Sequence, residues 1–229
     1  MAIARYLAMT AEEFASAASV TEPIAWMACH FSPYSTSLSN LPQSLPAHSL
    51  LLLNDSTPPR HTNPEIVAKD VANVLKSQNC SGILLDFQRP GNSVALEIVK
   101  ALLQLDCRIC VSECYAKDLN CPVFLPPLPL TMPLDEYIAP WKGREIWLDT
   151  ALSCEQITVT ATGSTSRTIF CAQECPLADE VLHCHYHITV NDDSIVFTLQ
   201  RTKADLAALL ADAEKCGIAA TVGLYQELK

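Results

Sequence analysis

The sequence has little charge, no long hydrophobic run and no cluster of basic residues. Its 229 residues comprise 17% charged and 49% hydrophobic side chains, and the formal net charge is −10. Without a basic run, neither a nucleic-acid backbone nor an anionic membrane surface is an expected partner. The longest purely apolar stretch, around 50–53, is far shorter than the roughly 20 residues that a membrane helix needs.

Signals for export and for cofactor binding are also missing. Glu12 and Glu13 interrupt the N-terminal stretch before it reaches the length of a signal-peptide core. Together with the acidic charge, this predicts a soluble, cytoplasmic protein. The chain has no internal repeat, no glycine-rich phosphate-binding loop and no Gly-x-Ser-x-Gly motif, so we expect no cofactor.

Cysteine, by contrast, is abundant, with 11 residues. In a long chain without an export signal, an odd number of cysteines predicts reduced thiols that behave as small buried hydrophobes. Cys107, Cys110, Cys114 and Cys121 lie close together in sequence and leave zinc or an iron–sulfur cluster open as an alternative. Residues three apart on a strand face opposite sides, however, so we expect Cys107 and Cys110 not to share a metal ion.

Three alternating histidines form a second cluster with metal-binding chemistry. His183, His185 and His187 would share one face of a strand, where adjacent pairs could hold zinc or copper. Alternate strand residues are about 7 Å apart, so one ion could reach all three only under strain. We therefore expect a solvent-facing hairpin surface and no metal.

Short apolar runs alternate with amphipathic stretches, which is the pattern of βαβ units. Helix starts are marked by Thr10 with Glu13 and by Asn63 before Pro64. Strands are expected at 3–8, 24–31, 50–54, 82–87, 107–113, 123–125, 145–149 and 219–224, and helices at 10–19, 64–77, 93–103, 134–141 and 202–216.

The pattern changes after the seventh expected strand. Segments 156–162 and 167–170 flank a Gly163-Ser164 turn, and segments 183–190 and 194–200 flank a second turn, as in antiparallel hairpins. Eight strands with intervening helices predict an α/β fold, a (β/α)8 TIM-type barrel. We expect a single domain, 1–229, with 155–200 as a β-hairpin insertion after strand seven.

A barrel of this kind carries its site at the carboxyl ends of its strands. The sequence places five polar residues there: Asp55, Asp86, Gln88, Glu113 and Asp149. A cluster of carboxylates suits general acid–base chemistry on sugars. Acidic loop residues also commonly cap helices, and Asp55 and Asp149 fit that role as well.

The segment from Ser81 to Pro90 reads Ser-Gly-Ile-Leu-Leu-Asp-Phe-Gln-Arg-Pro. It resembles the signature strand of family 18 glycoside hydrolases, the chitinase-like barrels, whose pattern is Asp-Gly-x-Asp-x-Asp-Trp/Phe-Glu. Segments 186–203 and 217–222 are similar to the hairpin, helix start and last strand of the spore-associated branch of this family. The resemblance covers most of the chain and implies the same barrel fold.

The resemblance also implies a chemistry whose residues this chain has largely lost. In the family, the substrate's N-acetyl group attacks while a glutamic acid protonates the leaving oxygen. Gln88 stands at that position, and an amide has no proton to give near neutral pH. Ser81 and Leu84 stand at the positions of two family aspartates. Only Asp86, which would orient the acetamido group, is retained.

Two further family features are missing. Segment 124–128 contains no Tyr-Asp pair, where the family has Met-x-Tyr-Asp. The tryptophan that floors the family's sugar site on the last strand is also absent, and Gly223 or Tyr225 lies nearest, depending on the register.

These departures favour a degenerate chitinase-like barrel without chitinase-type hydrolysis. Its old cleft would bind an N-acetylglucosamine-containing glycan, such as a peptidoglycan fragment, or a protein partner. The expected ligand-binding residues are Asp55, Asp86, Gln88, Glu113, Asp149 and Tyr225. One alternative is an active glycosidase with relocated acids, Asp86 with Glu113 or Asp149. Another is a structural, spore-associated scaffold protein.

Overall fold

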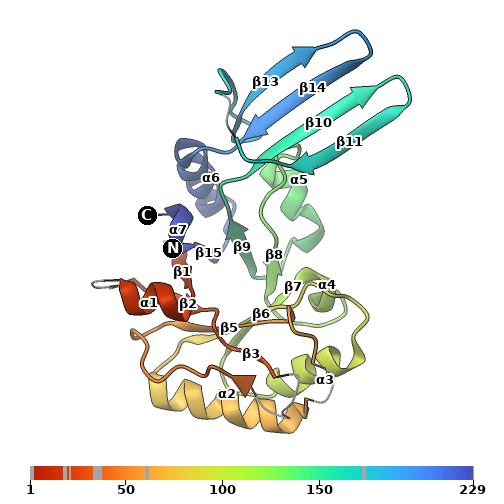
Figure 1. The fold of residues 1–229 in the computed structure, drawn as a ribbon. Coiled ribbons are helices and arrows are strands. Elements are labelled where there is room, and N and C mark those ends of the chain that lie inside the picture. The colour runs from red at the N-terminus through yellow and green to blue at the C-terminus, as the bar shows by residue number, and fades with distance from the viewer. Residues whose placement is uncertain are drawn as a thin grey trace.

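The computed structural model describes residues 3–17, 20, 22–32, 38–59, 62–171 and 174–228, and its parallel strands close into a barrel (Figure 1). The strands pair in the order β1-β2-β5-β6-β7-β8-β9-β15, and β15 pairs again with β1. Their bounds are β1 Ala4–Met9, β2 Ile24–Trp26, β5 Leu50–Asn54, β6 Gly82–Asp86, β7 Arg108–Ser112, β8 Val123–Leu125, β9 Ile146–Thr150 and β15 Ala220–Leu224. The predicted TIM-type barrel is confirmed.

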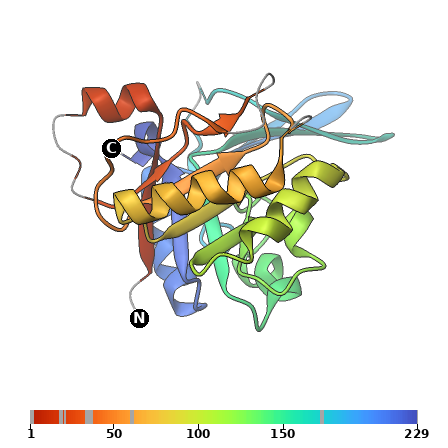
Figure 2. The ribbon, with the colours of Figure 1, turned by 90° about the horizontal axis from the view of Figure 1, so that it is seen from below.

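Helices cover the outside of the barrel. They are α1 Ala11–Ser16, α2 Pro64–Gln78, α3 Ser93–Leu102, α4 Glu113–Ala116, α5 Leu134–Ile138, the 3-10 helix η1 Ala139–Trp141, α6 Lys203–Lys215 and α7 Tyr225–Leu228. Figure 2 shows α2 and α3 side by side on one flank. The predicted capping box of Thr10 with Glu13 is present, and a second joins Thr202 to Asp205. No helix of the described part is long and apolar enough to cross a membrane.

The segment between β9 and α6 forms a second, antiparallel sheet that projects from the barrel (Figure 1). We call it the insertion sheet, and its strand order is β11-β10-β14-β13-β12. The strands are β10 Cys154–Thr160, β11 Gly163–Thr168, β12 Leu177–Asp179, β13 Cys184–Val190 and β14 Ser194–Gln200. The insertion after the seventh barrel strand is therefore confirmed. Gly163 and Ser164 belong to β11 and not to the turn, and β12 was not expected.

The expected second strand, 24–31, is in fact two strands. β2 stays in the barrel, whereas β3, His30–Phe31, pairs antiparallel with β4, Leu38–Ser39. The sequence hides the break because the residues between them are also apolar, and Cys29 is fully buried. The first helix, expected to reach residue 19, ends at Ser16, and residues 18 and 19 lie outside the described part.

The buried side chains of the barrel form an outer and an inner core, and a small third cluster lies under the insertion sheet. The outer core lies between the strands and the helices and includes Val67 and Val71 of α2. The inner core fills the barrel below its carboxyl-terminal mouth, where Tyr6 stacks on Trp147 with ring centroids 5.8 Å apart. The guanidinium of Arg108 lies 4.7 Å from the centroid of the Trp147 ring. The barrel is therefore solid at this end, and its open space lies at the mouth.

One cysteine pair corrects the expectation of reduced thiols throughout. Cys154 at the start of β10 and Cys171 after β11 form a disulfide, while the other nine cysteines form no disulfide. The β10–β11 hairpin brings the chain back on itself, and the Ile169 N–H donates to the Cys154 carbonyl at 3.0 Å. Cysteines 17 positions apart in sequence thus have Cα atoms 5.8 Å apart. Their spacing alone does not reveal this, because it depends on the register of the hairpin.

Candidate functional site

A cavity of about 580 Å³ opens at the carboxyl ends of the barrel strands. We call it the barrel cavity. Four of the expected site residues line it: Asp55, Asp86, Gln88 and Asp149. Apolar side chains complete its lining, among them Ala8, Leu52, Phe124 and Val222. An adjoining pocket of about 320 Å³ shares Asp86, Gln88 and Asp149 and adds Glu113.

Asp86 ends the fourth barrel strand, Gln88 follows two residues later, and Leu84 lies below them. Alternation along β6 turns all three inward, as expected, and Leu84 is fully buried in the inner core. Gln88 Nε2 donates to Asp86 Oδ1 at 3.1 Å. Burial raises the pKa of the Asp86 carboxyl, the hydrogen bond from Gln88 opposes the rise, and the charge of Asp55 adds to it. Asp86 therefore holds a proton more readily than an exposed aspartate.

Asp55 is a buried residue that fixes the loop after β6. Only 3% of it is exposed, and its carboxylate accepts the backbone N–H of Gln88 at 3.0 Å and that of Arg89 at 2.9 Å. The Tyr115 hydroxyl donates to the Arg89 carbonyl at 2.6 Å, and Arg89 Nη2 donates to the Ser56 carbonyl at 3.1 Å. The helix-capping role left open for Asp55 is therefore not what the structure shows, because its carboxylate binds the loop after β6 instead. Asp55 positions Gln88 at the cavity.

Among the carboxyl groups that line the cavity, that of Asp149, near the end of β9, has the largest pKa shift. Burial raises its pKa from the ordinary value to about 7, the charges of Asp86 and Glu227 add to the rise, and a hydrogen bond from the Thr150 backbone opposes it. Glu227 is itself held, because its Oε2 accepts the Leu152 N–H at 2.7 Å. Near neutral pH, Asp149 can therefore either donate or accept a proton.

The remaining two expected residues lie apart from this group. Glu113 begins α4 and reaches only the adjoining pocket. Tyr225 begins α7 and packs against the outer core, and it is not among the residues that line the cavity. Leu224 and Val222 of β15 line the cavity in its place. The structure thus brings five of the six expected residues to connected pockets and leaves Tyr225 outside.

Three neighbours of the site were not expected. Arg89 is the one basic residue among those that line the described cavity. Phe124 lines both pockets. In the sheet it pairs with Ser112 and Trp147, and knowledge of this register would have been needed to predict its place at the site. Tyr137 of α5 donates to the Pro126 carbonyl at 2.9 Å. Burial and the charges of Glu113 and Asp149 raise the pKa of Tyr137.

The histidine cluster anchors the insertion sheet instead of facing solvent. His183 is 7% exposed and its Nε2 lies 3.3 Å from Asp212 Oδ2, while His185 Nδ1 lies 2.8 Å from Asp205 Oδ2. The expected solvent-facing surface is therefore wrong for these two residues, because α6 packs beside them. In the described part of the chain, no three His, Cys, Asp or Glu residues are placed to hold a metal ion.

The cysteine geometry agrees with the strand argument. Cys110 packs in the inner core, whereas Cys107 packs against the outer core. The two side chains therefore lie on opposite sides of the barrel wall, as their spacing predicts.

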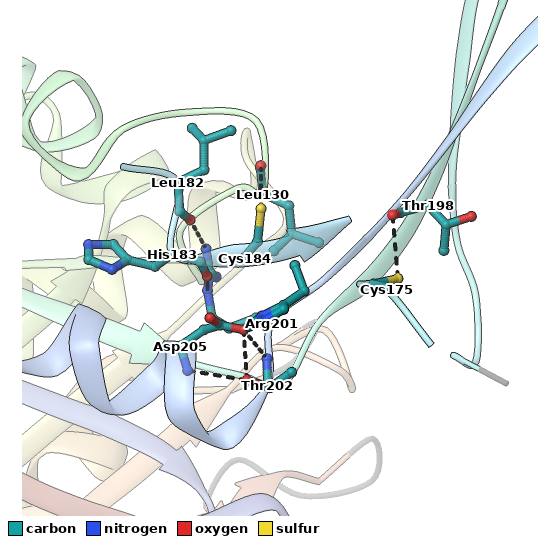
Figure 3. A network of polar contacts seen from close by, with 10 residues as sticks. Leu130, Cys175, Leu182, His183, Cys184, Thr198, Arg201, Thr202 and Asp205 are labelled. Atoms are coloured by element: carbon teal, nitrogen blue, oxygen red, sulfur yellow. Dashed lines mark hydrogen bonds and ion pairs between the residues drawn. The ribbon is translucent and has the colours of Figure 1, made fainter. Parts of the chain in front are cut away.

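Arg201 joins the insertion sheet to the barrel (Figure 3). The residue is 2% exposed and follows β14 directly. Its Nη1 donates to the Leu128 carbonyl at 2.7 Å, its Nε to the His183 carbonyl at 3.2 Å and its Nη2 to the Leu182 carbonyl at 3.3 Å. The guanidinium thus ties the end of β14 to the loop after β8 and to the residues before β13.

Comparison with solved structures finds the same barrel fold in a known enzyme. The crystal structure of the spore cortex-lytic enzyme SleL of Bacillus cereus matches with a TM-score of 0.60 at 7% identity, over 100% of this chain and 72% of that chain. At this identity the similarity shows the fold alone. No protein-family model and no curated protein matches the sequence.

Two further solved structures align less closely. SleL of Bacillus megaterium QM B1551 aligns with a TM-score of 0.44 at 11% identity, over 76% of this chain and 55% of that chain. The chain thus spans little more than half the length of that enzyme. The C-terminal domain of a putative chitinase from Desulfitobacterium hafniense DCB-2 aligns with a TM-score of 0.42 at 10% identity, over 76% of this chain and 72% of that domain.

Proposed function

We propose that the barrel cavity binds a glycan with N-acetylated amino sugars and does not cleave it by the chitinase mechanism. The observation that carries the proposal is Gln88, whose amide lies beside Asp86 in the cavity at 3.1 Å. Gln88 can donate to and accept from a sugar, and Asp86 can accept an amide N–H or a hydroxyl. Neither the amide nor the buried Leu84 below it supplies the acid that the chitinase reaction needs.

The cavity has the composition of a site for a partly apolar ligand. Its carboxylates and two amides, of Asn54 and Gln88, stand above an apolar floor that includes Phe124. A pyranose ring offers an apolar face together with hydroxyl and amide groups, so it matches such a lining. The similar B. cereus structure is a spore cortex-lytic enzyme, which favours a cell-wall glycan and a spore-associated setting for this chain as well.

Calorimetric titration of the protein with N-acetylglucosamine oligomers and peptidoglycan fragments tests this proposal. We expect binding by the wild type, affinity at least about tenfold weaker in Asp86→Ala, and no change in Asp192→Ala, whose carboxylate lies on an exposed turn of the insertion sheet. No release of reducing sugar should accompany binding. Absence of binding, or hydrolysis that Asp86→Ala abolishes, would contradict the proposal.

A second candidate function is hydrolysis with relocated acids. It is favoured by Asp149, whose pKa is raised to about 7 in the cavity that also holds Asp86. A carboxyl with such a pKa can act as a general acid near neutral pH, and a neighbouring carboxylate can serve as its partner. Turnover of peptidoglycan fragments that Asp149→Asn abolishes would support it. Equal, background-level release of reducing sugar from both proteins would eliminate it.

A further inference from the structure

A second pocket, of about 840 Å³, lies between the insertion sheet and the barrel. We call it the insertion pocket. Its walls come from segments 127–130, 151–155, 168–171 and 200–203. It shares Ala151 with the barrel cavity and Pro127 with the adjoining pocket. The insertion pocket therefore adjoins both pockets at the barrel mouth.

The charges of the two spaces have opposite signs. The barrel cavity is lined by three carboxylates and one guanidinium. The insertion pocket is lined by two cations, Arg201 and Lys203, and one carboxylate, Glu155. This is an unusual balance in a chain with a net charge of −10, and it favours an anionic group on the ligand. Arg201 is buried and forms no ion pair with any residue that the structure describes.

An aromatic side chain stands on the rim of the insertion pocket. Phe170 is fully exposed, at 101%, although both of its neighbours are fixed. Cys171 is joined to Cys154 by the disulfide, and the Ile169 N–H donates to the Cys154 carbonyl. The Phe170 ring is therefore available to contact a ligand at the rim of the pocket.

Segment 127–130 makes another part of the lining apolar. Segment 127–130 reads Pro-Leu-Pro-Leu and presents no side-chain hydrogen-bond donor or acceptor. A sugar placed there would leave hydroxyl groups without partners on that side, and this costs free energy. A peptide with small or apolar side chains and a terminal carboxylate fits this combination of apolar walls and cations better.

We infer that the insertion pocket takes a short peptide branch, ending in a carboxylate, of the glycan whose sugar lies in the barrel cavity. This inference rests on the proposed function and narrows the ligand to a peptide-substituted glycan. The shared Ala151 and Pro127 place the branch next to the sugar. Phe170 and the half-buried Pro127 and Pro129 contact its side chains, and Arg201 and Lys203 attract its carboxylate.

Titration with three matched probes tests the inference. The probes are the disaccharide of N-acetylglucosamine and N-acetylmuramic acid, the same disaccharide bearing a tetrapeptide, and the tetrapeptide alone. We expect the tetrapeptide to raise the affinity for the disaccharide about tenfold or more. In Phe170→Ala and Lys203→Met, the disaccharide with the tetrapeptide and the disaccharide without it should bind with nearly equal affinity. Val190→Ala, which removes an exposed apolar side chain elsewhere on the insertion sheet, should keep the wild-type ratio of these two affinities.

The outcomes separate this inference from the proposed function. Equal affinities for both disaccharides would overturn the inference while leaving glycan binding intact. A gain from the peptide that survives in both pocket variants would overturn it too. If neither disaccharide binds, the proposed function fails. In that case, binding of the tetrapeptide alone that Phe170→Ala removes would still support the pocket, and its absence would overturn it. If longer N-acetylglucosamine oligomers bind more tightly than short ones, and Phe170→Ala removes this increase in affinity, the insertion pocket is a sugar subsite and the inference is overturned.

Discussion

Gln88 and Asp86 are joined side chain to side chain across 3.1 Å, with the amide as donor and the carboxylate as acceptor. The backbone N–H of Gln88 is at the same time held by buried Asp55. Gln88 thus donates to two carboxylates at the barrel mouth, to Asp86 from its side-chain amide and to Asp55 from its backbone N–H. The following predictions test this arrangement and the attachment of the insertion sheet.

Replacing Gln88 with glutamate should make stability depend more steeply on pH. The variant removes a donor from Asp86 and adds a like charge, so the pKa of Asp86 rises further. A folded-state pKa above the unfolded one lowers stability as pH rises through that range. We expect a loss of roughly 1–2 kcal/mol at pH 8 and a smaller loss at pH 5 by urea unfolding. Gln104→Glu on the exposed surface is the control, and a similar loss there would refute the coupling.

Asp55→Ala should loosen the loop after β6. The backbone N–H groups of Gln88 and Arg89 lose their acceptor. Unsatisfied groups of this kind cost roughly 1–3 kcal/mol each, so we expect about 3 kcal/mol of lost stability in urea. Asp118→Ala, on the exposed turn after α4, should change stability by less than about 0.5 kcal/mol. Unchanged hydrogen exchange of residues 88 and 89 in Asp55→Ala would contradict the positioning role.

Asp149→Asn should stabilise the protein at alkaline pH. The folded-state pKa of Asp149 is about 7, above the unfolded value, so the wild type loses stability as pH rises from about 4 to 7. Asparagine keeps the shape and removes the charge. We expect a flatter pH profile and a gain of roughly 1–3 kcal/mol at pH 8. The measurement is thermal unfolding from pH 4 to 8, and a profile parallel to that of the wild type would contradict the raised pKa.

Arg201→Met should detach the insertion sheet from the barrel. The substitution removes three hydrogen bonds from a buried guanidinium to the carbonyls of Leu128, Leu182 and His183. We expect a loss of roughly 3 kcal/mol, with faster hydrogen exchange in β13 and β14. Arg167→Met is the matched control, because Arg167 bonds only an exposed Gln156. Equal effects of the two substitutions would show that Arg201 is no anchor.

Breaking the Cys154–Cys171 disulfide should affect the insertion sheet alone. The disulfide closes a loop with a sequence separation of 17, for which the chain-entropy model gives roughly 3 kcal/mol. In Cys171→Ser, hydrogen exchange should increase in β10 and β11 and stay unchanged in β5 and β6. Cys216→Ser, at an exposed free thiol, is the control. Thiol titration of the unfolded, unreduced wild type should find nine groups, and eleven would mean that no disulfide forms.

Much of the barrel could be predicted from the sequence because its signals are local. Capping residues such as Thr10 and Asn63 place helix starts, and alternation along β6 turns Asp86 and Gln88 inward. The break in segment 24–31 could not be predicted, since apolar residues continue through it. Tyr225 was expected at the site because nothing local shows whether a residue belongs to the end of β15 or to the start of α7.

The features that could not be predicted depend on long-range register. Arg201 contacts a carbonyl 73 positions away along the chain, and Asp55 reaches the loop 33 positions away. The histidines pair with α6 only because the insertion sheet folds back beside it. Each of these contacts joins elements that are far apart in the sequence, and the periodicity of the sequence does not show which distant elements pack together.

The stack of Tyr6, Trp147 and Arg108 has a consequence for how a polymer could be bound. It closes the barrel at the end opposite the mouth, so a ligand enters and leaves through the same opening. A long chain can therefore not be threaded through the barrel, and successive units cannot be fed past the carboxylates in one direction. A polymer must either present its end or lie across the rim, and each encounter must end by withdrawal along the path of entry.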